Sequence, residues 1–168
     1  MRDTIRFKIL RAVNLGIFTP EIEALRRSLG LPGMLVLHFV FGDPVCNSYA
    51  PHNHTPVNVI YTGTHDNNTS LGWFEEDASS AEIANLSRYL GREVNRRTAA
   101  GEMVRMAMSS VAETAVVPMQ DHLELGAFCR INIPSTPTGN WAWRMMPGQA
   151  DERLASCLRE LTELYGRA

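Results

Sequence analysis

The chain has 168 residues, of which 45% are hydrophobic and 20% charged, and its formal net charge is −2. These values fit one globular domain that is long enough to bury a core, and they exclude disordered, collagen-like and coiled-coil classes. The small net charge, together with the lack of a basic tract in the sequence, argues against nucleic acid or an anionic membrane as a partner.

Four segments of the sequence predict β-strands, namely residues 6–13, 34–41, 57–63 and 114–120. The second is apolar almost throughout, which is typical of a strand buried on both faces of a sheet. The segment between the second and third strands, residues 42–56, is rich in Pro, Asn and His and predicts a loop.

Helices are predicted between and after these strands. Thr19 is placed to cap a helix that begins at Pro20, and its apolar residues Ile22, Leu25 and Leu29 recur at helical spacing. Ser79 and Glu82 form the pattern of a capping box at the start of a second helix. Residues 101–112 predict a third helix, and an amphipathic helix is expected over about 150–166.

The alternation of strands and helices predicts an α/β fold with a sheet whose functional side chains gather at the carboxyl ends of the strands. No internal repeat or linker divides the sequence, so residues 1–168 are expected to form one domain. A closed (β/α)₈ barrel has eight strands and typically about 250 residues. If the architecture is a barrel, this chain is expected to form part of one.

The His65–Asp66 pair follows the third predicted strand, where a carboxylate can face a cleft. One use for Asp66 is to stabilise the positive charge that develops on a sugar during glycosyl transfer, while His65 donates a hydrogen bond to a sugar hydroxyl. The alternative is a structural turn, since Asn67, Asn68 and Thr69 are equally suited to closing a loop.

A metal site is a competing interpretation of the same region. His52, His54, His65, Asp66 and Cys46 are ligand types that zinc or iron uses, and adjacent His and Asp residues occur in metal-dependent phosphohydrolases. The further His and Asp residues that such a site needs on helices are missing from the sequence. The sequence therefore argues against a bound metal, and neither a metal nor another cofactor is expected.

Aromatic residues lie near both ends of the candidate region. Trp73 and Phe74, and Trp141 and Trp143, could form platforms on which sugar rings stack, or they could pack in the core.

No nucleophile elbow and no glycine-rich phosphate loop is present in the sequence. Cysteines at 46, 129 and 157 indicate neither a disulfide framework nor a zinc ribbon, and no segment predicts a secretory signal or a membrane span. The expected location is the cytoplasm.

Five segments together resemble the C-terminal portion of the 4-α-glucanotransferases, also called amylomaltases or disproportionating enzymes. They are "LGIFTPEIEALRRSLGLPGMLVLHFVFG", "YAPHNH", "VIYTGTHDNNTSLGWF", "VVPMQDHLELG" and "RINIPSTPTGNWAWR", and the resemblance runs from about residue 12 to 146. It implies the C-terminal half of a (β/α)₈ barrel of the α-amylase kind. It also implies a retaining transfer of α-1,4-glucan segments between maltodextrins, without a metal or organic cofactor.

The resemblance assigns roles to four residues. Asp66 matches the family's third carboxylate, which stabilises the transition state, and His65 matches the histidine beside it. Arg130 and Asn132 match a loop at the rim of the active site, where they are expected to contact substrate.

The sequence also departs from the family pattern. Val13 stands where the family has the Glu that acts as general acid/base, and the family's nucleophilic Asp would lie on a strand that precedes this chain. Asn14, His38 and Asn68 are smaller departures, and the usual residue at the position of His38 is Gln. Three functions therefore remain open: a fragment of a transferase, a non-catalytic glucan-binding or partner-binding domain, and, most remotely, a metal-dependent hydrolase.

A half barrel has consequences for association. Its two sheet edges carry unpaired backbone groups, and one apolar face of the sheet lacks its filling. We expect the chain to bind the missing N-terminal half of the barrel or to associate with itself.

Overall fold

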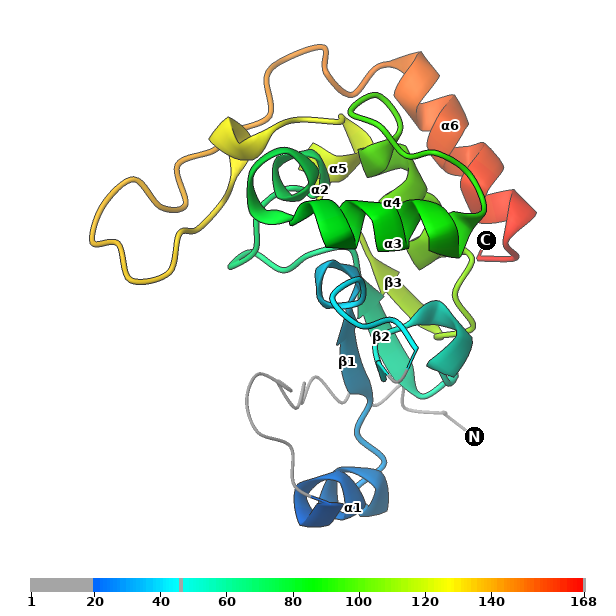
Figure 1. The fold of residues 1–168 in the computed structure, drawn as a ribbon. Helices are drawn as coiled ribbons and strands as arrows, with labels where there is room; N and C mark the ends of the chain where they lie inside the picture. Colours follow the sequence, from blue (N-terminus) through cyan, green and yellow to red (C-terminus); the bar gives the residue numbers. More distant parts are fainter. Residues whose placement is uncertain (1–19, 46, 168) are drawn as a thin grey trace, which may run out of the picture.

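The structure is a computed structural model that describes residues 20–45 and 47–167 (Figure 1). In this part of the chain, three parallel strands form one open sheet: β1 (Gly33–Val36), β2 (Asn58–Tyr61) and β3 (Thr114–Val116), in that order. Val36 pairs with Tyr61, and Tyr61 pairs with Val116, so the carboxyl ends of the strands meet at one edge. The α/β class is confirmed, while the strand predicted over residues 6–13 lies outside the described residues.

All three described strands end earlier than the sequence predicts, β2 by two residues and the other two by more. β1 stops at Val36, because the chain turns into a 3₁₀ helix over Leu37–Phe39 in which Val40 N donates to Leu37 O. β3 stops at Val116, two residues before Pro118, which has no N–H to donate to a neighbouring strand. The predictions of strand to residues 41 and 120 were therefore wrong at their C-terminal ends.

The predicted helices are all present in the described residues, with shifted ends for two of them. They are α1 (Pro20–Ser28), α3 (Ser80–Leu90), α4 (Ala99–Met108) and α6 (Glu152–Leu164). The sequence did not predict the short helices α2 (Ser70–Gly72) and α5 (Met119–His122), the π-helical turn Trp73–Asp77, or the 3₁₀ turns Pro51–Asn53 and Ala127–Cys129.

The main core lies on one face of the sheet. Leu35 and Ile60 on the strands pack in one cluster with Leu86 of α3 and Met103 of α4. The opposite face carries a second cluster that consists of Met34, Val36 and Tyr61, each at most 8% exposed. The apolar sheet face that a half barrel is expected to expose is therefore buried at these positions.

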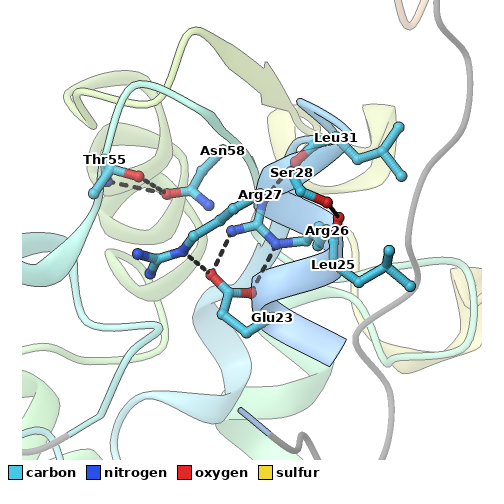
Figure 2. A network of polar contacts seen from close by, with 8 residues as sticks. All are labelled: Glu23, Leu25, Arg26, Arg27, Ser28, Leu31, Thr55 and Asn58. Carbon is cyan, nitrogen blue, oxygen red and sulfur yellow. Dashed lines mark hydrogen bonds and ion pairs between the residues drawn. The ribbon is translucent and has the colours of Figure 1, made fainter. Parts of the chain in front are cut away.

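Helix α1 stands apart from α2 to α6 (Figure 1), and the side-chain contacts of its arginines stay within the helix and the connection that follows it. Arg26 is 9% exposed, donates to both carboxylate oxygens of Glu23 and donates from Nη1 to Leu31 O at 2.5 Å. Figure 2 shows Arg26 and Arg27 reaching Glu23 while Leu25 points the other way. Ile22 and Leu25 on α1 and Leu29 just after it are exposed apolar residues.

Helix α6 contacts α4 and has no fully buried side chain, although Leu154, Leu158 and Leu161 are half-buried. It is anchored by Arg167, whose guanidinium donates to Met108 O and Ser110 O at 2.6 Å and to Ala112 O at 3.0 Å. No described helix is long and apolar enough to cross a membrane.

Candidate active site

The candidate site is built on the segment that joins β2 to α2, residues 62–70, here named the Asp66 loop. Asn67 closes a turn inside this loop, because its Oδ1 accepts from Thr64 N at 2.9 Å and from Thr64 Oγ1 at 2.8 Å. Thr69 Oγ1 accepts from Gly72 N and caps α2. The structural turn that the sequence suggested thus exists, but Asn67 forms it, and the carboxylate of Asp66 is left for other contacts.

The structure brings all four predicted site residues together. Asn132 Nδ2 donates to Asp66 Oδ1 at 2.5 Å, and Arg130 Nη2 donates to the backbone carbonyl of Asp66 at 2.7 Å. Asn132 N donates to His65 O at 3.1 Å, and His65 Nε2 lies 3.4 Å from Asp66 Oδ1. Residues more than sixty positions apart in the sequence therefore fix the orientation of one carboxylate.

The carboxylate of Asp66 faces solvent on its other side. Its side chain is 38% exposed, and Oδ2 has no hydrogen-bond partner among residues 20–45 and 47–167. The ring of Trp141 lies 5.0 Å from that of His65 and is 58% exposed. The open carboxylate oxygen therefore belongs to the residue next to His65, whose ring the exposed ring of Trp141 contacts.

The other aromatic residues take different positions. Trp73 is 5% exposed and belongs to the main core, and Phe74 packs against that core. Core packing is therefore the correct interpretation for this pair. Trp143 is half-buried, and Arg144 donates to the carbonyls of Trp141 and Trp143, which holds their backbone.

A buried polar network lies beneath the Asp66 loop. Asp121 of α5 is 1% exposed and accepts from Thr62 and Ser70, and Ser70 Oγ lies 3.2 Å from His38 Nε2. Burial raises the pKa of Asp121, and hydrogen bonds from Ser70 and Thr62 oppose that shift. Burial, and secondarily the positive charge of Arg130, lowers the pKa of His38 to about 3. His38 is therefore neutral at physiological pH.

Close packing around the network requires glycine at two positions. A Cβ atom at Gly63 would lie 2.6 Å from His38 Cε1, and one at Gly72 would lie 2.9 Å from the backbone Cα of Ala127. Both distances are below the contact limit of carbon atoms, so a side chain at either position would displace its neighbours. These approaches pack the Asp66 loop against His38 and pack α2 against the turn that begins at Ala127.

The roles of Asp121, Thr62 and Ser70 were missed by sequence reasoning. Asp121 lies within the segment "VVPMQDHLELG", where a carboxylate among mostly apolar neighbours was the available signal. Thr62 and Ser70 gave no signal, because their importance depends on the approach of α5, which is distant in the sequence.

The metal interpretation finds no support in the part of the chain that the structure describes. His54 is engaged at both ring nitrogens, by Ser110 Oγ at 2.7 Å and Tyr49 O at 2.8 Å, and His52 contacts Tyr89 OH. Neither histidine joins Asp66, and no group of three or more potential ligands occurs among the described residues. Cys46, Val13 and Asn14 lie outside those residues.

Comparison with known proteins identifies the family of the chain. The family model described as 4-alpha-glucanotransferase, of glycoside hydrolase family 77, matches residues 8–150. The chain belongs to the 4-alpha-glucanotransferase family. The family that the sequence motifs indicated is thus confirmed.

Three curated 4-alpha-glucanotransferases show how much of the family protein the chain represents. The relative from Synechocystis is 46% identical over 157 residues, that from Thermus thermophilus 45% over 164, and that from Solanum tuberosum 42% over 159. Each alignment covers 93% of this chain but only 31%, 32% and 27% of the respective relative. The chain thus spans about a third of the length of these 4-alpha-glucanotransferases.

Two solved structures resemble the fold. An amylomaltase from Streptococcus agalactiae, in complex with acarbose, matches 91% of this chain with a TM-score of 0.84 and 34% identity, and the match covers 31% of that protein. The amylomaltase from Corynebacterium glutamicum matches with a TM-score of 0.58 at 18% identity, which shows a shared fold alone. The described sheet therefore corresponds to part of an amylomaltase structure.

Proposed function

We propose that the chain supplies one wall of a maltodextrin-binding cleft and the transition-state-stabilising carboxylate of a 4-α-glucanotransferase. In this proposal, Asp66 Oδ2 faces the sugar ring at which the glycosidic bond breaks. Positive charge that develops on that ring is stabilised by a carboxylate already fixed in position. The observation that carries the proposal is the Asp66 carboxylate itself, which is oriented on one side by Asn132 and open on the other.

The neighbouring groups have distinct parts in the proposal. Asn132 and His65 contact Asp66 Oδ1, and the second Nδ2 hydrogen of Asn132 and the Nδ1 atom of His65 are left for sugar hydroxyls. Arg130 braces the backbone of Asp66 and of Asn132, so that the two sides of the site move together. The exposed face of Trp141 offers an apolar surface that suits the C–H groups of a pyranose.

A second candidate function is glucan binding without catalysis. The observation that favours it is Val13, which stands in the sequence where the family motif carries its acid/base Glu. An isopropyl group cannot protonate a leaving oxygen, and positioned proton transfer contributes about 10²- to 10⁴-fold to the rate.

Calorimetric titration with acarbose, the ligand named with the S. agalactiae amylomaltase, tests the site. We expect Asp66→Asn to weaken binding by about tenfold or more, because the change removes the charge that faces the ligand. Asp151→Asn is the matched control, since Asp151 caps the distant helix α6. Equal affinities of Asp66→Asn and the unmodified chain would place Asp66 outside the sugar site.

Incubation with maltotriose separates the two functions. Formation of glucose and longer maltodextrins would show transfer by this chain. Acarbose binding without those products would support the second candidate.

A further inference from the structure

One buried carboxylate joins both ends of the Asp66 loop. Thr62 immediately follows β2, and Ser70 begins α2. Thr62 Oγ1 donates to Asp121 Oδ2 at 2.5 Å, while Ser70 donates to Asp121 twice, from N at 2.7 Å and from Oγ at 2.8 Å. Asp121 is thus the point at which the entry and exit of the loop are held together.

The burial of Asp121 makes its hydrogen bonds to Thr62 and Ser70 costly to break. A carboxylate that is 1% exposed loses its hydration, which is a large cost unless donors replace it. The three donors that satisfy Asp121 are those of Thr62 and Ser70. Moving either end of the loop away would leave a buried charge with fewer partners, so the network resists such a movement.

His38 extends the network on the side of Ser70. Because the single hydroxyl proton of Ser70 is donated to Asp121, Ser70 Oγ can only accept from His38, which fixes the proton of the ring on Nε2. The ring stacks on Trp73 at 5.5 Å, and Nδ1 is buried without a hydrogen-bond partner among the described residues. Ser70 is therefore held from two sides.

We propose that Asp121 is a positioning residue for the carboxylate of Asp66, acting through Thr62 and Ser70 to hold the loop in the shape that binds a maltodextrin. The proposal rests on the function proposed above and assigns to the site a residue that does not itself touch sugar. Loss of either tether widens the range of loop conformations, so that fewer molecules present Asp66, His65 and Asn132 in binding geometry.

Two substitutions at Thr62 separate the tether from simple packing. Thr62 is fully buried, so Thr62→Val keeps the volume but removes the hydroxyl, whereas Thr62→Ser keeps the hydroxyl and removes a methyl group. We expect Thr62→Val to weaken acarbose binding by about tenfold and Thr62→Ser by less than about threefold. If Thr62 acted only through packing, Thr62→Ser, which loses a methyl group, would weaken acarbose binding more than Thr62→Val, which keeps the volume.

Amide hydrogen exchange gives a measurement that does not depend on sugar binding. Asp66 N donates to Thr64 Oγ1 and Asn67 N donates to Thr64 O, so both amides report the shape of the loop. We expect Thr62→Val to accelerate their exchange, Thr62→Ser to leave it near that of the unmodified chain, and the amides of α3 to be unaffected. Thr162→Val is the matched control, because the hydroxyl of Thr162 donates to Leu158 O within α6.

The outcomes distinguish this proposal from the function on which it rests. Faster loop exchange in Thr62→Val alone supports the tether, even if the unmodified chain binds no acarbose, a result that would refute the sugar site. Unchanged loop exchange in Thr62→Val would overturn the positioning role. So would equal losses of acarbose affinity in the Val and Ser variants.

Discussion

At the scale of single residues, the candidate site combines groups that the sequence can identify with groups that it cannot. His65 and Asp66 stand out in the sequence because they follow a strand, and Arg130 and Asn132 were identified by resemblance to the family motif. Their meeting in space depends on hydrogen bonds across more than sixty residues. Burial of Asp121 and His38 is set by tertiary packing, which no local pattern in the sequence encodes.

His38 gives a prediction about stability and pH. Its pKa is about 3 in the folded chain and 6.5 when unperturbed, so between these values the unfolded state binds more protons at this position than the folded state does. The free energy of unfolding that depends on His38 is therefore greatest above about pH 6.5 and is lost as the pH falls toward 3.

Substitution of His38 by Gln, the residue usual in the family motif, removes this titration. We expect the free energy of unfolding of His38→Gln to fall less steeply than that of the unmodified chain between about pH 6.5 and 4, with a difference in slope of up to about 1.4 kcal/mol per pH unit. Urea unfolding across this range measures both slopes. The raised pKa of Asp121 changes the free energy of unfolding with pH in the opposite direction, but Asp121 is present in both proteins and does not affect the comparison. Equal slopes in the two proteins would contradict the lowered pKa of His38.

At the scale of elements, helix ends were predictable where local chemistry sets them. The Ser79–Glu82 capping box is present at the start of α3 as the sequence predicts, and Gly91 ends the helix with φ of 67°. Strand ends were less predictable, because the apolar segment after Val36 continues as a 3₁₀ helix in which Leu37 and His38 are still buried. Hydrophobicity alone cannot distinguish these two conformations.

Helix α6 gives a prediction at this scale. No side chain of α6 is fully buried, and the guanidinium of Arg167, just after the helix, anchors it to the carbonyls of Met108 and Ser110. We expect Arg167→Ala to lower the free energy of unfolding by about 1–2 kcal/mol. We also expect faster amide exchange over Glu152–Leu164. Arg153→Ala, at an exposed position of the same helix, is the control, and unchanged exchange in α6 after loss of Arg167 would refute the anchoring role.

At the scale of the whole molecule, the fold class follows from the alternation of elements, and the surface for association does not. The sequence predicts that a half barrel exposes an apolar sheet face, but Met34, Val36 and Tyr61 are buried. The exposed apolar residues that form a row lie on α1 instead. An amphipathic helix in sequence is expected to bury such a row, and α1 buries Arg26 in its place.

This row predicts how the chain associates in solution. Ile22, Leu25 and Leu29 are 48%, 59% and 52% exposed at helical spacing, and exposed apolar side chains grouped in this way favour contact with a second chain. We expect the apparent mass in sedimentation to rise with protein concentration.

The double substitution Leu25→Gln and Leu29→Gln should shift the chain toward monomer and change the free energy of unfolding by less than about 0.5 kcal/mol, because exposed side chains contribute little to it. Leu164→Gln is the matched control, since Leu164 is 61% exposed on the distant helix α6. Persistence of the larger species in the double variant would direct attention to the sheet edges, where unpaired backbone groups can join two chains.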